Sequence, residues 1–119
     1  MLVDTSVWVD HFRRRNASLA ARLEASQVWT HELVVGELAC GNLSRRGEIL
    51  SSLAMLPHAS LADHDQVLRL VSDRHLMGKG LGWIVMHLLA AAVNADLAFW
   101  TLDKRLAVVA ADLGLAPAS

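Results

Sequence analysis

Three acidic residues stand at positions where a fold could gather them into one site. Asp4 follows a short apolar segment at residues 2–3, and Asp103 follows a second apolar segment at residues 97–101. If these segments are parallel strands, both carboxylates project from the same edge of the sheet. Each acid taken alone has another explanation, because Asp is a preferred N-cap and each of the two precedes a predicted helix.

Glu37 is the third acid, and its neighbours in the sequence are less polar. Positions three and four residues away share its face of a helix, and they hold Leu33, Val34, Cys40 and Gly41. This pattern predicts that Glu37 faces the interior, where a lone carboxylate is costly unless it is paired or binds a metal. Three converging acids indicate a hard-cation site, for which Mg²⁺ is the expected ion and Mn²⁺ the alternative.

The remaining reactive residues do not indicate a second kind of chemistry. The histidines show no paired spacing of the HExxH type, and one cysteine cannot form a zinc cluster. The glycines at positions 78, 80 and 82 follow a predicted helix and lack the Lys-Ser/Thr of a phosphate-binding loop. The other acids fit solvated helix surfaces, helix first turns or the opposite edge of the sheet.

The composition favours one compact domain. Of the 119 residues, 54% are hydrophobic and 19% are charged, so the chain can bury a core without disulfides or a structural metal. The single cysteine, together with the lack of a signal-peptide pattern and of a membrane-length apolar segment, favours a cytoplasmic protein with no membrane contact. We therefore expect residues 1–119 to form a single domain.

The charge balance differs from that of many nucleic-acid-binding proteins. The formal net charge is −1, so any contact with RNA must use local basic clusters. These clusters lie at residues 13–15, 45–46, 79 and 104–105. Each cluster taken alone is also explained as a solvated helix surface.

Strand and helix signals alternate along the chain. Short strands are predicted at residues 2–3, 27–30 and 97–101. Helices are predicted at residues 6–14, 18–24, 31–40, 45–55, 63–76 and 83–94, with a last one starting at Asp103. Ser18 and Thr30 are expected as caps, and Asp63 with Gln66 as a capping box. The alternation predicts an α/β fold with a small parallel sheet covered by helices on both faces, a three-layer α/β/α domain.

Four short motifs, in this order along nearly the whole chain, resemble those of the VapC-type PIN-domain toxins of toxin–antitoxin systems. They read Asp-Thr-Ser-Val-Trp at residues 4–8, Val-Gly-Glu-Leu at 35–38, Gly-Trp-Ile at 82–84 followed by His-Leu-Leu-Ala at 87–90, and Trp-Thr-Leu-Asp-Lys-Arg-Leu at 100–106. The resemblance implies a PIN-like fold and a metal-dependent endoribonuclease that hydrolyses RNA. It also implies a homodimer and a cognate antitoxin protein that inhibits the enzyme.

The resemblance assigns roles to particular residues of this chain. Asp4, Glu37 and Asp103 match the family's acidic positions and are the expected catalytic and metal-binding residues. Hydroxyl groups beside the first and last of these acids are expected to hydrogen-bond the carboxylates or the water around the ion. The hydroxyl residues concerned are Thr5, Ser6 and Thr101.

The chain departs from the family pattern at Val85, where members usually carry Asp. The residues three and four positions away are Leu81, Gly82, Leu88 and Leu89, and none can replace a carboxylate ligand. We therefore expect Val85 on the wall of the site, and a chain with weak metal binding and reduced or absent activity. Two alternatives stay open: a catalytically inactive PIN-like protein that binds antitoxin, and a nucleotide-binding α/β module in which the acids are caps.

Overall fold

Two short parallel strands lie at the centre of the molecule. In the computed structural model, which describes residues 1–118, β1 (Leu2–Val3) pairs with β2 (Phe99–Trp100). Leu2 stands opposite Phe99 and Val3 opposite Trp100, and both strands run in the same direction. The buried side chains of β1 are β-branched or aliphatic, as expected for a strand covered on both faces.

The strand predicted at residues 27–30 is wrong as a full strand, although its backbone does pair. Trp29 bridges Leu2 and Thr30 bridges His58, each in parallel and each through a single pair of residues. Trp29 N donates to the Met1 carbonyl at 2.8 Å, and Val3 N donates back to the Trp29 carbonyl at 3.3 Å. After Thr30 the chain leaves the sheet, because His31 is already the N-cap of the next helix.

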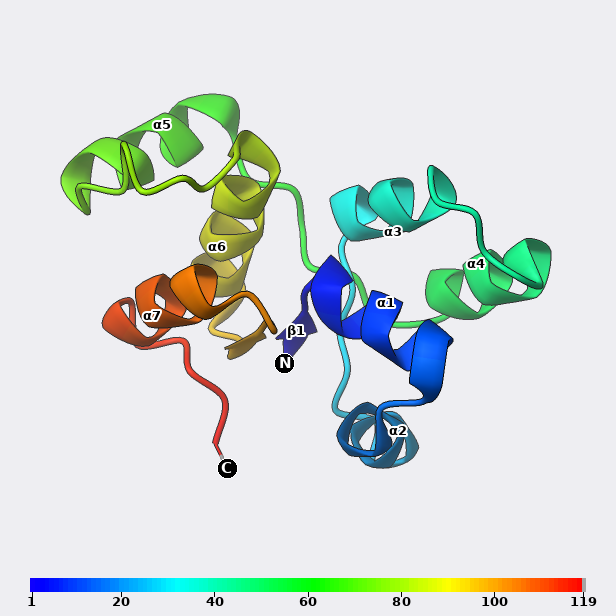
Figure 1. The fold of residues 1–119 in the computed structure, drawn as a ribbon. Coiled ribbons are helices and arrows are strands. Elements are labelled where there is room, and N and C mark those ends of the chain that lie inside the picture. The colour runs from blue at the N-terminus through cyan, green and yellow to red at the C-terminus, as the bar shows by residue number, and fades with distance from the viewer. Residues whose placement is uncertain (119) are drawn as a thin grey trace.

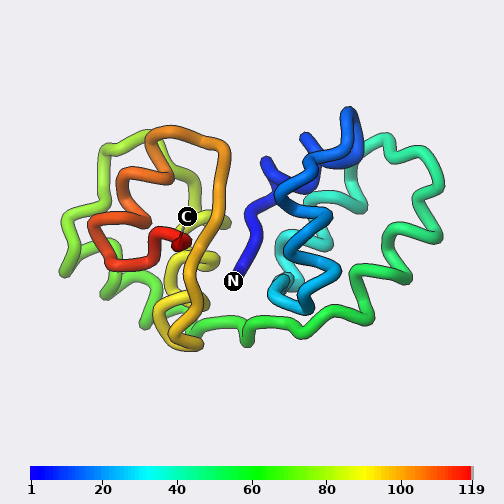
Figure 2. The backbone as a smooth tube through the Cα atoms, turned by 90° about the horizontal axis from the view of Figure 1, so that it is seen from below, coloured from blue at the N-terminus to red at the C-terminus, as the bar shows by residue number. Residues whose placement is uncertain are grey.

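The helices divide into two groups on either side of β1. Helices α1 to α4 lie to one side of the strand and α5 to α7 to the other, and a view at right angles gives the same division (Figure 1, Figure 2). This arrangement confirms the predicted α/β architecture with a small parallel sheet between helical layers. The helices are α1 (Thr5–Arg14), α2 (Ala17–Glu24), α3 (Glu32–Ala39), α4 (Arg46–Ala54), α5 (His64–Asp73), α6 (Trp83–Ala95) and α7 (Lys104–Asp112).

Two helices begin with caps other than the expected ones. Asn16, and not Ser18, caps α2, because its side-chain oxygen accepts the N–H of the residue three positions on at 3.0 Å. His31, and not Thr30, caps α3, through Nδ1, which accepts the N–H two positions on at 3.0 Å. The Thr30 hydroxyl is buried without a hydrogen-bond partner in the described part of the chain.

The predicted capping box of Asp63 and Gln66 is also wrong. Asp63 occupies the N-cap position of α5 but its side chain makes no capping hydrogen bond. The Gln66 amide instead exchanges two hydrogen bonds with the Asn94 amide, at 2.7 and 3.1 Å, and so ties α5 to α6. Gln66 therefore bonds a residue 28 positions away in the sequence and not the start of its own helix.

The centre of the core is α6. Its residues 86–92 are all buried, and Leu88 and Leu89 are fully so. Each such leucine contributes roughly 1.5–3 kcal/mol through the burial of its side chain. None of the helices between residues 1 and 118 has both the length and the hydrophobicity needed to cross a bilayer.

Candidate active site

The carboxylate of Asp4 lies at the carboxyl end of β1 and is buried, with 6% of the residue exposed. Its Oδ2 accepts hydrogen bonds from the Ser6 hydroxyl at 2.7 Å and from the Thr101 hydroxyl at 2.8 Å. Asp4 occupies the N-cap position of α1, but its side chain makes no capping hydrogen bond. The capping explanation of Asp4 is therefore wrong, and the two hydroxyl groups orient this carboxylate.

The same hydroxyl groups connect the ends of the two strands. Ser6 Oγ lies 3.2 Å from Thr101 Oγ1 and accepts the N–H of Leu102 at 3.0 Å. Thr101 Oγ1 in turn accepts the N–H of Asp103 at 3.1 Å. The segment after β2 is thus fixed to the start of α1 by side-chain hydroxyls.

Asp103 follows the second strand, as predicted, and it is the N-cap of α7. Its Oδ1 accepts the N–H groups of Arg105 at 3.0 Å and Leu106 at 3.3 Å. The capping explanation is therefore right for Asp103. The cap uses only one oxygen of the Asp103 carboxylate, and Asp103 is exposed.

Glu37 does not face the interior, so that prediction is wrong. The buried stripe of α3 is formed by Val34 and Leu38, and Glu37 lies on the exposed flank of this stripe. Its Oε1 accepts a hydrogen bond from the Thr5 hydroxyl at 2.7 Å, which joins α3 to the first residue of α1. Glu37 therefore lies next to the residue that follows Asp4, but it is not a buried charge.

The three carboxylates share one pattern of hydrogen bonding. In each, one oxygen is engaged by the protein, while the other has no hydrogen-bond partner or basic partner among residues 1–118. The described residues hold no group of three His, Cys, Asp or Glu side chains close enough for one metal ion. The acids are thus linked through Thr5, Ser6 and Thr101 and are not gathered around a single point.

The chain matches known proteins over nearly its whole length. The family profile of the PIN domain matches residues 1–112. The chain belongs to the PIN-domain family. It is 42% identical over 117 residues to Ribonuclease VapC32 of Mycobacterium tuberculosis, in strain CDC 1551 / Oshkosh and in strain ATCC 25618 / H37Rv. The aligned residues cover 98% of this chain and 94% of each relative. The resemblance to VapC-type PIN domains is confirmed.

Val85 lies in the first turn of α6 of this PIN domain, three residues after the N-cap Gly82. Its side chain is half-buried and packs against the hydrophobic core. The buried residues one turn further along α6 are Leu88 and Leu89, so they supply no carboxylate in place of Val85. The role of position 85 as a site residue stays a prediction.

One buried residue of this PIN domain, a histidine on the helix of Glu37, was not indicated by any motif or spacing in the sequence. His31 is fully buried at the start of α3, the helix that carries Glu37. Burial lowers the pKa of His31; the Glu32 carboxylate opposes this effect, and His87 and His58 add to it. Because Nδ1 accepts a backbone N–H, the neutral ring carries its proton on Nε2, which has no partner among the described residues.

Proposed function

We propose that this PIN-domain protein is a single-domain, metal-dependent endoribonuclease toxin that hydrolyses RNA phosphodiester bonds. The Asp4 carboxylate carries the proposal: it is buried and held by two hydroxyls, and no basic side chain between residues 1 and 118 forms an ion pair with it. A buried charge of this kind is costly unless a cation accompanies it. The 42% identity to a ribonuclease supports the same conclusion.

The type of donor, carboxylate oxygen, fits a hard divalent cation, although no three acids among the described residues surround one point. We infer Mg²⁺, with Mn²⁺ as the alternative. The free carboxylate oxygens of Asp4, Glu37 and Asp103 are the type of donor that Mg²⁺ prefers, with water filling the other positions. Such an ion, when bound, supplies an activated water and neutralises charge on the phosphate. Ser6 and Thr101 keep one oxygen of Asp4 occupied, and Thr5 does so for Glu37, so each carboxylate presents its other oxygen.

We further infer that the partners are RNA, a cognate antitoxin protein and a second copy of this chain, in the cytoplasm. Several large apolar side chains are exposed, which supports protein–protein contacts. They are Met55, Leu61, Leu68, Met77, Trp83, Ile84, Val93, Leu102 and Val108. The open carboxylate oxygens suit an antitoxin segment that inserts a basic side chain.

Cleavage of a labelled RNA pool in Mg²⁺ and in EDTA tests the proposal. We expect weak cleavage in Mg²⁺ that EDTA abolishes and that Asp4→Asn also abolishes, since the amide keeps the size of the side chain but loses the charge. Asp65→Asn is the matched control, because Asp65 is exposed in the first turn of α5. Cleavage that is equal in EDTA, or unchanged in Asp4→Asn, contradicts the proposal.

A second candidate function rests on Val85. An apolar side chain at this position removes one carboxylate that the family pattern places there, so the protein would bind antitoxin without cutting RNA. This candidate differs from the first in one measurement. It expects no cleavage at any Mg²⁺ concentration from the unchanged chain.

A further inference from the structure

The guanidinium group of Arg105 lies against the backbone of Gly80. A Cβ atom added at Gly80 would stand 2.5 Å from Arg105 Nη1 and 3.4 Å from its Cζ, closer than any side chain tolerates. Gly80 also has a φ of +76°, which favours glycine. The end of the Arg105 side chain therefore rests on Gly80 in the loop between α5 and α6, and a side chain at position 80 would have to displace it.

This guanidinium has no acidic partner among residues 1–118. The ion pairs among residues 1–118 are Arg14 with Asp10 and Arg45 with Glu48, and no hydrogen bond from the Arg105 side chain occurs in the same part of the chain. Arg105 is exposed. An arginine packed in place without an internal acceptor has its donors available for an external anion.

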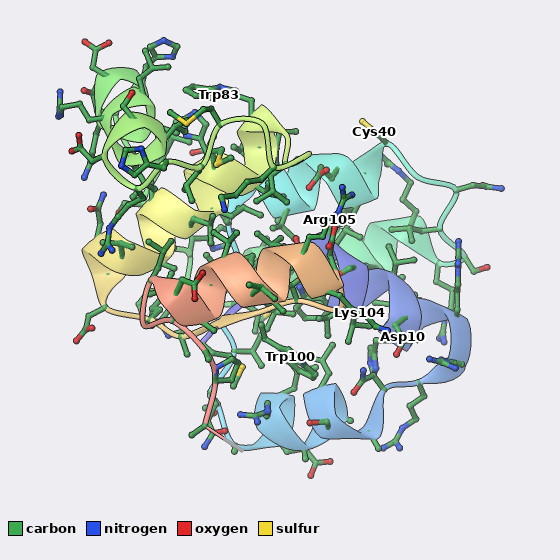
Figure 3. All side chains as sticks on the ribbon, turned by 60° about the vertical axis from the view of Figure 1, so that its left-hand side comes forward. Asp10, Cys40, Trp83, Trp100, Lys104 and Arg105 are labelled. Carbon is green, nitrogen blue, oxygen red and sulfur yellow. The ribbon has the colours of Figure 1, made fainter. Side chains whose placement is uncertain are left out.

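The position of Arg105 is fixed relative to the candidate active site. Its backbone N–H donates to Asp103 Oδ1 at 3.0 Å, so its Cα stays beside the acid while its side chain reaches Gly80. Arg105 and its neighbour Lys104 lie at the start of α7 (Figure 3). Lys79 is an exposed cation of the same loop as Gly80. Lys104 and Arg105 thus lie within two residues of Asp103, and Lys79 adjoins the glycine that the Arg105 side chain reaches.

We propose that Arg105, seated on Gly80, binds a phosphate group of the single-stranded RNA that the active site takes. This inference rests on the proposed function, because it names the group that holds the substrate of that same site. The acids of the site repel RNA phosphates and the net charge of the chain is −1, so a local cation is needed to bring the strand in. Arginine binds phosphate through parallel N–H donors. Its contact with Gly80 holds the side chain in place before binding, which lowers the entropic cost.

Fluorescence anisotropy with a short labelled single-stranded RNA tests the proposal, with Ca²⁺ in place of Mg²⁺ and the RNA checked for integrity afterwards. We expect Arg105→Ala to weaken binding about tenfold. The slope of log affinity against log salt should fall by about 0.7, the value for one phosphate contact on a single strand. Arg105→Lys should keep most of the slope while losing part of the affinity, because it retains the charge without the planar donors.

Two further variants separate a seated arginine from general electrostatics. Gly80→Ala leaves the net charge unchanged but displaces the guanidinium, so we expect weaker binding. Arg69→Ala removes an exposed charge on α5, outside the basic clusters, and should leave the affinity nearly unchanged. Thermal melts confirm that each variant is folded, and Arg105→Lys remains informative if the alanine variant is not.

The proposal is overturned if Arg105→Ala and Arg69→Ala weaken RNA binding equally, or if neither does. It is also overturned if the unchanged chain does not bind RNA, or if Arg105→Ala weakens only the binding of a protein partner. A chain that binds RNA through Arg105 but cuts nothing supports this inference and contradicts the proposed function. A protein that cuts and binds RNA equally well after Arg105→Ala supports the proposed function and contradicts this inference.

Discussion

The hydroxyl of Thr101 donates a hydrogen bond to Asp4 Oδ2 at 2.8 Å, although 97 positions separate the two residues in the sequence. The parallel pairing of β1 with β2 makes this contact possible, because both residues follow directly on their strands. Thr101 is buried, so the bond is shielded from water. A shielded hydrogen bond to a charged group contributes about 1.5–3 kcal/mol.

We predict that Thr101→Val lowers both stability and divalent-metal affinity. Valine has the shape of threonine but leaves Asp4 Oδ2 with one donor fewer, at a cost of about 1–3 kcal/mol. The loss of a residue that orients a metal ligand typically lowers metal affinity about 10–100-fold. Urea denaturation and calorimetric Mg²⁺ titration measure the two effects. Thr101→Ser keeps the hydroxyl and serves as the control; if valine and serine behave alike, the hydrogen bond is unimportant.

Asp103 has two roles that two substitutions can separate. Asp103→Ala removes the cap of α7 and should destabilise the protein by about 1 kcal/mol. Asp103→Ser keeps a capping oxygen but removes the carboxylate, so it should preserve stability and still lose Mg²⁺-dependent cleavage. Thermal melting and an RNA cleavage assay on both variants check this. Retention of cleavage by the serine variant would mean that Asp103 is a cap and nothing more.

Val85→Asp should increase Mg²⁺ affinity and RNA cleavage if position 85 faces the site. The added carboxylate would compensate its own burial only when a cation is present, so the melting temperature should rise on adding Mg²⁺. Cleavage rates and melting curves with Mg²⁺ and with EDTA give the answer. Val85→Asn, which has the same size without the charge, is the control.

The opposite outcome for Val85 has a clear physical meaning. The side chain packs against the hydrophobic core, and an unpaired charge there costs several kcal/mol. A Val85→Asp protein that is less stable in Mg²⁺ as well as in EDTA, and still inactive, would show that position 85 is ordinary helix packing. The binding-only function would then lose its main argument.

Stability should fall as the pH drops below about 6.5, because burial lowers the pKa of His31. The unfolded chain then takes up a proton at a higher pH than the folded one, so acid favours unfolding. Well above pH 6.5 the contribution of His31 is complete. Urea denaturation across this range for the unchanged chain and for His31→Asn, which keeps a capping oxygen without titrating, measures the effect. Equal pH slopes for the two proteins would sink the prediction.

The sequence alone sufficed for the helices whose ends are marked by local chemistry. The helices beginning near Thr5 and Trp83, and the one after Asp103, start within about one residue of their predicted positions, because apolar periodicity marks them; of the three, only the last also has a side-chain cap. The failures involve partners far away in the sequence. Gln66 pairs with Asn94 instead of capping α5, which no local pattern can predict.

The candidate site was likewise predictable from the sequence only in part. The positions of Asp4 and Asp103 after parallel strands followed from the order of elements. The prediction that Glu37 faces inward was wrong, because its neighbours at positions 40 and 41 lie on an exposed helix end. Figure 3 shows Cys40 projecting from this end of α3. A helix shorter than three turns gives too few positions to fix which face is buried.

The pairing of β1 with β2 also has a consequence for synthesis on the ribosome. Residues 2–3 leave the ribosome well before their strand partner at residues 99–100. Until then Asp4 lacks the Thr101 hydroxyl, and Asp103 is not yet part of the chain that has emerged. The arrangement of acids therefore cannot exist on a nascent chain. Any activity that depends on it begins only after residues 99–103 have left the ribosome.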